Sequence, residues 1–543
     1  MNSLPVDQAA RDRITDDLGT TLFVEAGAGS GKTTALIDRV VALVTTGTAE
    51  LEAIAAITFT EKAGAELRDR VRHSLEDEAS ETGDAEIAER CRKALDQLDA
   101  SAIGTLHAFA QRLLTEHPVE AGLPPRVEVL DEVESGLEFD RRWTAFRDQL
   151  FADPTLRRTI LLLIASGVKH QALRVLAQAF DDNWDLVEER VPAEVPDPPA
   201  ARPLMAVALA KIKRVCDQVC ECTNPDDLLC VRLVEIAQHV ERLAAIDNEL
   251  DMLEALGKEA PVKLPSFNLG SVGRRGCWNI DLATLRAEVR EAGEGLDGVR
   301  STVAQACAKK IASTIRRFTL QAAEERRGAG RLEFHDLLVL SRSMLRHPQH
   351  GSTVRSWLHR RYQRLLLDEF QDTDPIQIEL AVRIAAEDPN SPAAGESPWD
   401  QVPVAPGRLF VVGDPKQSIY RFRRADIDTF MRASARFGPE GGGVVELTVN
   451  FRTGEPVINW VNQTFRHPDV RAAGRGDAHP LPTEVPGAAG GQDRAPGRAG
   501  GVDRLPRPLS QGNRRRCPAR GGGPGGGSGH CDRSGRRLGG GRP

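Results

Sequence analysis

A glycine-rich turn near the N-terminus is the first place where residue types and spacing suggest chemistry. Residues 22–34 read LFVEAGAGSGKTT, an apolar run, then the turn, then the start of an apolar helical pattern. Glycines let consecutive backbone N–H groups point at phosphate oxygens, and the N-terminus of the following helix adds its positive dipole end. Lys32 can reach the outer phosphates, and the Thr33 hydroxyl can bind Mg²⁺. The pattern predicts a strand, a phosphate loop and a helix, with Ala26 at the first glycine position of the usual motif.

Two adjacent carboxylates follow a second apolar run. Residues 365–367 are all leucine and predict a buried strand, and Asp368 and Glu369 stand at its C-terminal end. In a phosphate-loop enzyme the first acid at such a place can hold Mg²⁺, and the second can orient and deprotonate the attacking water. The alternative is an acidic turn after a strand. That alternative is weakened because both halves of a nucleotide site occur in one chain.

A third strand pattern, residues 409–413, also ends in polar residues. Gln417 follows it and is placed to sense a terminal phosphate. Tyr420 and Phe422 then alternate with arginines, an arrangement that suits stacking on unpaired bases beside phosphate contacts. A core Tyr/Phe pair with solvated arginines is the alternative interpretation.

Two single residues complete the set of nucleotide candidates. The strand pattern that begins at residue 444 leads to Arg452, which can act on a γ-phosphate. Gln8 precedes the phosphate loop and can hydrogen-bond an adenine edge, although an ordinary surface glutamine remains the alternative.

The elements that must position these residues alternate between strand and helix. Residues 54–60 predict a buried strand that runs into a helix over 61–71, and a further strand near residue 102 enters another helix. Short turns between such elements predict a parallel α/β sheet with its ligands at the strand ends. From about 124 to 331 the pattern changes to long amphipathic helices, such as 155–180 and 228–256, and predicts a mostly α-helical insertion.

Composition bounds the rest. A chain of 543 residues is too long for one core, and no apolar run is long enough to span a bilayer. The N-terminus lacks the features of a secretion signal, so we expect a cytoplasmic protein without membrane contact. A group of cysteines lacks paired C-x2-C spacing, and free reduced thiols are preferred there over a metal site; its members are Cys216, Cys220, Cys222 and Cys230.

The C-terminal segment differs from the rest of the chain. From Arg471 to Pro543 there are fourteen arginines, five acids, and no lysine, isoleucine or aromatic residue. Its charge is therefore near +9, which leaves about −16 for the remainder of a chain whose net charge is −7. Such a segment buries too little apolar surface to fold. It is either a natural disordered tail that binds nucleic acid or, as we prefer, an out-of-frame translation of a GC-rich gene.

Six motifs in order, within residues 4–465, resemble the superfamily 1 helicases of the UvrD/Rep/RecB/AddA type, and two of them look most like the RecB/AddA branch. They are AGAGSGKT, ITFTEKAGAELRDRV, IGTLHAFAQRLL, LLLDEFQDTDPIQ, VVGDPKQSIYRFRRADI and LTVNFRT. The resemblance implies a RecA-like motor domain in two parts, 1–123 and 331–466. The helical accessory insertion would be residues 124–330, and the disordered tail would be residues 467–543.

The resemblance also implies roles for individual residues, with ATP and Mg²⁺ as cofactors. The catalytic set would be Lys32, Asp368, Glu369, Gln417 and Arg452, with Thr33 and Asp368 holding the metal. The ATP site would comprise Gln8, Ala26, Gly27, Ala28, Gly29, Ser30, Gly31, Lys32, Thr33, Thr34 and Phe451. The single-stranded DNA path would be lined by Phe59, Thr60, Thr105, His107, Tyr420 and Phe422.

The implied activity is ATP-driven movement along single-stranded DNA, mostly 3′ to 5′, in repair or recombination. The implied partners are single-stranded DNA, or DNA with a single-stranded end, with a nuclease subunit as a further candidate. The chain departs from the family in one respect, because two later motifs of a second motor domain are not found in it. We therefore expect impaired hydrolysis, and a non-catalytic, ATP-dependent single-stranded-DNA-binding protein is the alternative function.

Overall fold

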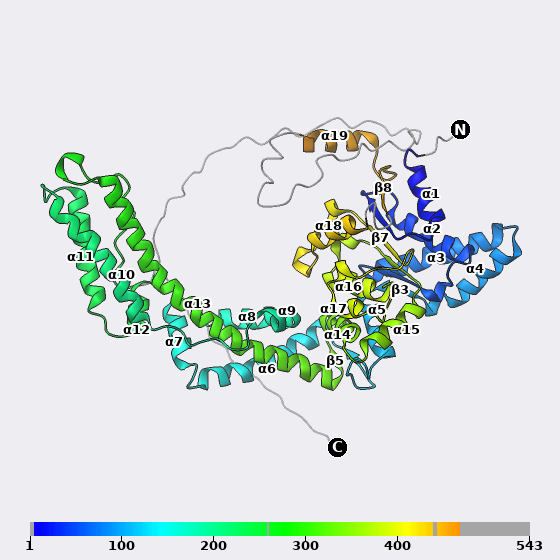
Figure 1. Cartoon of the computed structure of the whole chain (residues 1–543), viewed down its shortest axis with the longest axis horizontal. Helices are drawn as coiled ribbons and strands as arrows, with labels where there is room; N and C mark the ends of the chain where they lie inside the picture. The colour runs from blue at the N-terminus through cyan, green and yellow to red at the C-terminus, as the bar shows by residue number, and fades with distance from the viewer. Residues whose placement is uncertain (1–4, 258–259, 438–442, 467–543) are drawn as a thin grey trace, which may run out of the picture. The chain divides into compact units, whose positions relative to one another are not determined.

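The computed structural model describes residues 5–257, 260–437 and 443–466, and these fall in one compact unit, Met1–Gly491. The tail predicted for residues 467–543 lies outside the described residues. The compact unit contains a six-stranded sheet, of which β3, β7 and β8 are labelled in Figure 1. The strand order is β3-β2-β6-β7-β1-β8. The strands are β1 (Leu22–Ala26), β2 (Ile54–Thr58), β3 (Ala102–Thr105), β6 (Arg364–Leu367), β7 (Leu409–Gly413) and β8 (Val444–Leu447).

All neighbouring strands of this sheet run parallel. In register, Val24 of β1 lies between Val412 of β7 and Val445 of β8. The carboxyl ends of all six strands therefore meet at one edge, where ligands of such sheets bind. The predicted parallel α/β class is confirmed. Two strands are shorter than predicted, because the chain leaves the sheet after Thr58 and after Leu447.

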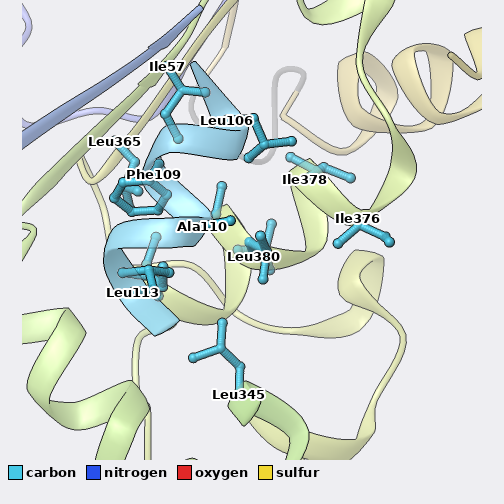
Figure 2. Packing of buried hydrophobic residues seen from close by; sticks show 14 of the residues in the cluster. Ile57, Leu106, Phe109, Ala110, Leu113, Leu345, Leu365, Ile376, Ile378 and Leu380 are labelled. Carbon is cyan, nitrogen blue, oxygen red and sulfur yellow. The ribbon is translucent and has the colours of Figure 1, made fainter. Parts of the chain in front are cut away.

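Both faces of the sheet are covered, and most strand residues are apolar and buried. Leu365 and Leu367 belong to one buried cluster and Leu366 to the other, as expected for side chains that alternate across a strand. Figure 2 shows part of the first cluster, in which Phe109 lies beside Leu365 and Leu113 follows further along the same helix. The helices around the sheet are α1 (Gln8–Asp16), α2 (Lys32–Thr45), α3 (Glu61–Glu81), α4 (Ala85–Gln97), α5 (Leu106–Glu116), α14 (Phe334–Arg346), α15 (Gly351–Arg361), α16 (Pro375–Ile384), α17 (Pro392–Glu396), α18 (Ile427–Arg436) and α19 (Glu455–Arg466).

The segment predicted to be a helical insertion is helical. A short parallel pair, β4 (Glu128–Val129) with β5 (Arg331–Leu332), brings its two ends together. Its helices are α6 (Glu132–Ala152), α7 (Arg157–Ala165), α8 (Gln171–Asp181), α9 (Trp184–Arg190), α10 (Ala201–Cys216), α11 (Leu228–Ala244), α12 (Glu249–Ala255) and α13 (Leu282–Ala329).

Two of the long helices predicted there are interrupted. The 155–180 helix breaks at Gly167, whose φ of +89° is left-handed and ends α7. The 228–256 helix breaks before α12, where the Asn248 side chain accepts a hydrogen bond from the N–H of Leu250 and starts a new helix.

Helix α13 is a single continuous helix of 48 residues (Figure 1, green). Its N-terminal half packs into one apolar cluster with α10 and α11, and its C-terminal half packs into a second cluster with α6 and α7. Gly293 lies where a Cβ would come within 2.4 Å of Phe267, so this position requires glycine. Gly295 and Gly298 have no neighbour within 4 Å of an added Cβ.

The C-terminal end of α13 joins α14 through a buried ion-pair network. Arg326, which is 2% exposed, donates to Asp336 over 2.8 Å from Nε and to Asp181 over 3.1 Å from Nη1. The indole N–H of Trp184 also donates to Asp336. Glu333 completes the group, with its carboxylate 3.6 Å from Arg326. Burial, opposed by Arg326 and reinforced by the carboxylates of Asp181 and Asp336, raises the pKa of Glu333 to about 7.

This shift predicts a pH dependence that Glu333→Gln should remove. Because the pKa is higher in the folded chain than its ordinary value of 4.5, protonated Glu333 favours folding below about pH 4.5, and that contribution is lost as the pH rises through about 7. The free energy of unfolding of wild type, measured in urea, should fall by about 2–3 kcal/mol relative to Glu333→Gln across that range. A difference between the two proteins that does not vary with pH would contradict the prediction.

The described cysteines, from Cys91 to Cys307, are free. Among the described residues no group of three or more His, Cys, Asp or Glu side chains is arranged to hold a metal ion. No described helix combines the length and apolar character that a membrane crossing requires.

Candidate nucleotide and nucleic-acid site

The glycine-rich turn connects β1 to α2 at the carboxyl edge of the sheet. Helix α2 begins at Lys32. Gly31 and Gly29 have φ values of +88° and +75°, which residues with a side chain rarely adopt. The loop is closed by Ser30, whose N–H and hydroxyl both donate to the carbonyl of Gly27. A 14-residue helix thus presents its N-terminus behind a glycine loop, which is the geometry that binds phosphate.

The predicted acidic pair lies at the end of β6 and contacts the loop lysine. Lys32 Nζ is 3.0 Å from Glu369 Oε2, and Gln371 Nε2 donates to the same oxygen over 2.7 Å. Glu369 has a φ of +47°, a conformation in which a non-glycine residue is strained. The strained backbone and two donors fix the carboxylate beside the phosphate loop.

Asp368 is buried, with 6% of its surface exposed. Burial, and then the charge of Glu369, raise its pKa to about 6. Carboxylate and hydroxyl oxygens are the ligands that Mg²⁺ prefers, and Mg²⁺ bound to nucleotides takes few protein ligands, with phosphates and water supplying the rest. A buried carboxylate at the strand end and Thr33 in the first turn of α2 fit that chemistry.

The segment after β8 lies against the phosphate loop. The Asn450 amide donates to the carbonyl of Ala28 over 2.8 Å, and the N–H of Phe451 donates to the carbonyl of Gly29 over 2.9 Å. Asn450 Oδ1 accepts from the N–H groups of Arg452 and Thr453. Arg452 lies so close to Gly29 that a Cβ added to Gly29 would be 2.7 Å from the Cβ of Arg452. The structure thus places two predicted residues, Phe451 and Arg452, at the loop.

Three residues of this arrangement were missed from the sequence: Asn450, Asp7 and Arg11. The Asp7 carboxylate accepts from the N–H groups of residues 448 and 449 and from Arg11. Arg11 also donates to the carbonyl of Ser30 over 2.9 Å and covers the Phe451 ring at 4.9 Å. Burial opposes ionisation of Asp7, but Arg11 and the two N–H groups lower its pKa. The Asp7–Arg11 spacing of four residues at a helix start was the available signal.

Gln8 lies on the same helix and donates to Asp12 over 2.7 Å at the surface. The structure gives no contact between Gln8 and the phosphate loop, so its role in binding adenine stays a prediction.

A cavity of about 600 Å³ opens between the phosphate loop, the end of β7, the end of β8 and α19. Its wall includes apolar side chains from β8 and α19, among them Leu447, Ile458 and Val461. Gln417 also lines it and donates to Asp414 over 2.6 Å. The predicted nucleotide residues on its wall are Ala26, Gly27, Ala28, Ser30 and Gln417.

Aromatic side chains from segments that follow different strands of the sheet contact one another. Phe59 after β2 contacts Tyr420 at 4.7 Å between ring centroids, and Tyr420 contacts Phe422 at 5.7 Å. Phe422 is 79% exposed, so the interpretation of a buried Tyr/Phe pair is wrong for this residue. His107, whose pKa is lowered by burial, packs edge-on against Phe334 at 5.6 Å. Phe334 is 55% exposed and was not predicted from the sequence.

The two predicted threonines have local structural partners. Thr60 Oγ1 accepts from the N–H of Ala63 and caps α3. Thr105 Oγ1 caps α5 and donates to Glu61 over 2.6 Å. These caps account for both residue types without a ligand, and contact with DNA stays a prediction for them.

Residues 6–438 match the UvrD/REP helicase N-terminal domain. The chain belongs to this family. The resemblance predicted from the six motifs is confirmed.

Several curated relatives share most of this chain, and each is named as one subunit of an ATP-dependent helicase/nuclease. The one from Pediococcus pentosaceus is 24% identical over 82% of this chain and 38% of its own length. Those from Syntrophomonas wolfei and Levilactobacillus brevis are both 26% identical, over 82% and 84% of this chain and 37% and 38% of their own. The chain therefore spans a little over a third of the length of the relatives that it matches.

Proposed function

We propose that the chain is the ATP-hydrolysing motor part of a UvrD/RecB-type DNA helicase, which couples hydrolysis to movement along single-stranded DNA, mostly 3′ to 5′, in repair or recombination. One observation carries the proposal. Gln371 connects three residues by hydrogen bonds. Its side-chain amide donates to Glu369 and accepts from the N–H of Asp414, and its backbone carbonyl accepts from the Ser418 hydroxyl. It links the nucleotide candidates directly to the segment that bears Tyr420 and Phe422.

In the mechanism that we propose, the loop around Gly29 and the N-terminus of α2 hold the phosphates. Thr33 and Asp368 would hold Mg²⁺, which supplies charge neutralisation at the phosphates. Lys32 transfers its contact from Glu369 to a phosphate oxygen, and the released carboxylate accepts a proton from water.

The remaining residues of the proposed nucleotide site then respond to the terminal phosphate. Gln417 and Arg452 sense it, and Gln371 passes the change to Ser418 and the exposed aromatic residues. Phe451, held by Arg11, stacks on the base.

A second function is proposed from the same residues. In the resembling helicases a second motor domain adds an arginine to the site, and positioned charge provides most of the catalysis of phosphoryl transfer. A nucleotide site formed by the described residues alone is therefore expected to bind ATP but hydrolyse it slowly, and to serve ATP-dependent binding of single-stranded DNA. The name of the relatives, which includes both helicase and nuclease, supports the proposal of a nuclease partner.

Alanine at Phe422 or Phe334 should test the nucleic-acid part of this function. Stacking contributes about 1–3 kcal/mol per base, so each variant is expected to weaken binding of a fluorescent single-stranded oligonucleotide about tenfold. Fluorescence anisotropy of the full chain, with and without ATP, measures the affinity. Phe151→Ala is the matched control, since that ring is 43% exposed on α6, away from the strand ends. Equal affinities for wild type, both variants and the control would contradict the proposed DNA path.

A further inference from the structure

Arg424 adopts a backbone conformation that favours glycine. Its φ is +67°, and it follows the short 3-10 turn Arg421–Arg423. Its N–H donates to the carbonyl of Arg421, and the N–H of Ala425 donates to the carbonyl of Tyr420. These two bonds form a Schellman-type ending, in which glycine is the usual residue at the left-handed position. A side chain kept there at a conformational cost has a compensating contact or a role.

The Arg424 side chain has such contacts, and they come from three other parts of the chain: α9, the residue before α16, and His335 of α14, whose Nε2 lies 2.6 Å from Nη1. Its two terminal nitrogens each lie 3.2 Å from an oxygen of Asp185, a two-pronged pair with a residue of α9 in the helical segment. Its Nε is 3.2 Å from Asp374, which follows β6 and caps α16. Asp185 is 1% exposed and also binds His335 and Arg342 of α14. The guanidinium therefore bridges the helical segment and the strand-end acidic motif.

The turn that Arg424 closes carries the aromatic pair. Tyr420 supplies the carbonyl of the longer turn bond, and Phe422 lies inside the turn. Two hydrogen bonds hold the N-terminal side of the same segment. The Ser418 hydroxyl donates to the Gln371 carbonyl, and the N–H of Ile419 donates to the Asp372 carboxylate. On its C-terminal side, Arg424 is the residue whose side chain joins the segment to α9.

We propose that Arg424 is a positioning residue, which fixes Tyr420 and Phe422 for single-stranded DNA by clamping their turn to Asp185 of the helical segment and to Asp374. The inference rests on the proposed function, because it assumes that these two rings contact DNA. It adds that the placement of the rings depends on the position of α9. A movement of the helical segment is therefore communicated to the DNA path through the Arg424 guanidinium.

Arg424→Gly in the full chain separates the side chain from the fold. Glycine suits a φ of +67°, and Asp185 keeps His335 and Arg342 as partners, so the variant should still fold and unfold in one cooperative transition. It should nevertheless bind a fluorescent single-stranded oligonucleotide about tenfold more weakly, because the rings lose their fixed placement. Asp185→Asn should cause a similar loss, and the double variant should be no weaker than the weaker of the two single variants.

Arg342→Gln is the matched control. It removes a different cation from the same Asp185 carboxylate, at 3.2 Å, without touching the 418–426 segment, and should leave DNA affinity unchanged. Hydrogen exchange without DNA gives a second readout, in which peptides covering 418–426 should exchange faster in Arg424→Gly than in Arg342→Gln.

The outcomes separate the two hypotheses. Wild type that fails to bind the oligonucleotide overturns the proposed function, and the positioning role with it. Wild type that binds, together with an Arg424→Gly variant that binds equally well or an Arg342→Gln variant that binds as weakly as Arg424→Gly, overturns only the positioning role.

Discussion

Lys32→Ala should weaken ATP binding by at least tenfold and up to about a hundredfold. The change removes the cation that we propose meets the outer phosphates, where a hydrogen bond to a charged group is worth about 1.5–3 kcal/mol. It also leaves the Glu369 carboxylate, formerly 3.0 Å from the ammonium group, facing the phosphates with its charge uncompensated. Both effects act against the nucleotide. Titration with a fluorescent ATP analogue in the presence of Mg²⁺ measures the change.

The fold should tolerate Lys32→Ala. Glu369 is 37% exposed, and ion pairs with such access to water contribute about 1 kcal/mol or less. Lys93→Ala is a suitable control, because Lys93 pairs with Glu50 at the surface. Lys32→Ala also tests whether the nucleotide site is in use. If single-stranded DNA binding by Lys32→Ala no longer responds to ATP, the nucleotide site controls DNA binding. If DNA binding and any cellular role of the chain are unchanged, the nucleotide site is vestigial.

Arg326→Met should destabilise the chain by about 3–5 kcal/mol. Arg326 is the cation shared by Asp181, Asp336 and Glu333, which are 3%, 2% and 18% exposed. Methionine of similar length fills the space but leaves these carboxylates without their main partner in a buried site, which is costlier than losing an exposed pair. Unfolding in urea, followed by circular dichroism at pH 8, measures the loss.

The neighbouring residue provides the control for Arg326. Arg327 is 39% exposed and pairs with Glu324, so Arg327→Met should change stability by less than about 1 kcal/mol. A loss below about 1 kcal/mol for Arg326→Met as well would show that the network does not stabilise the junction of α13 and α14.

Local patterns were sufficient to predict the sheet and the residues at its edge. The run that ends at Ala26 and the leucines before Asp368 are each a short apolar strand followed by polar residues, a signal carried within about ten positions. The parallel arrangement follows from their alternation with helices. The contact of Lys32 with Glu369 joins residues 337 positions apart, and the pairing of the two motifs in one site anticipated it.

The parts that the sequence did not reveal depend on contacts between distant segments. Asp7 looks like an ordinary helix cap, and its use as an acceptor for residues 448 and 449 exists only after folding. Arg424 stands in a run of arginines, and its left-handed backbone and its ion pairs with Asp185 and Asp374 exist only after folding. The breaks in the two long helices were missed because the helical spacing of apolar residues continues across Gly167 and Asn248. Glycine is nevertheless a known signal for a helix end, and asparagine for a helix start.

The 48 residues of α13 have a mechanical consequence. At 1.5 Å per residue the helix extends about 70 Å, with Arg326 near its C-terminal end. Proline is absent from it, but Gly293, Gly295 and Gly298 fall together near the boundary between its two apolar clusters. Since each glycine weakens a helix by about 1 kcal/mol relative to alanine, bending stress along this rod is relieved there first. We therefore expect the part of α13 on the Arg326 side of these glycines to move as one stiff unit, and the helix to bend at the glycines.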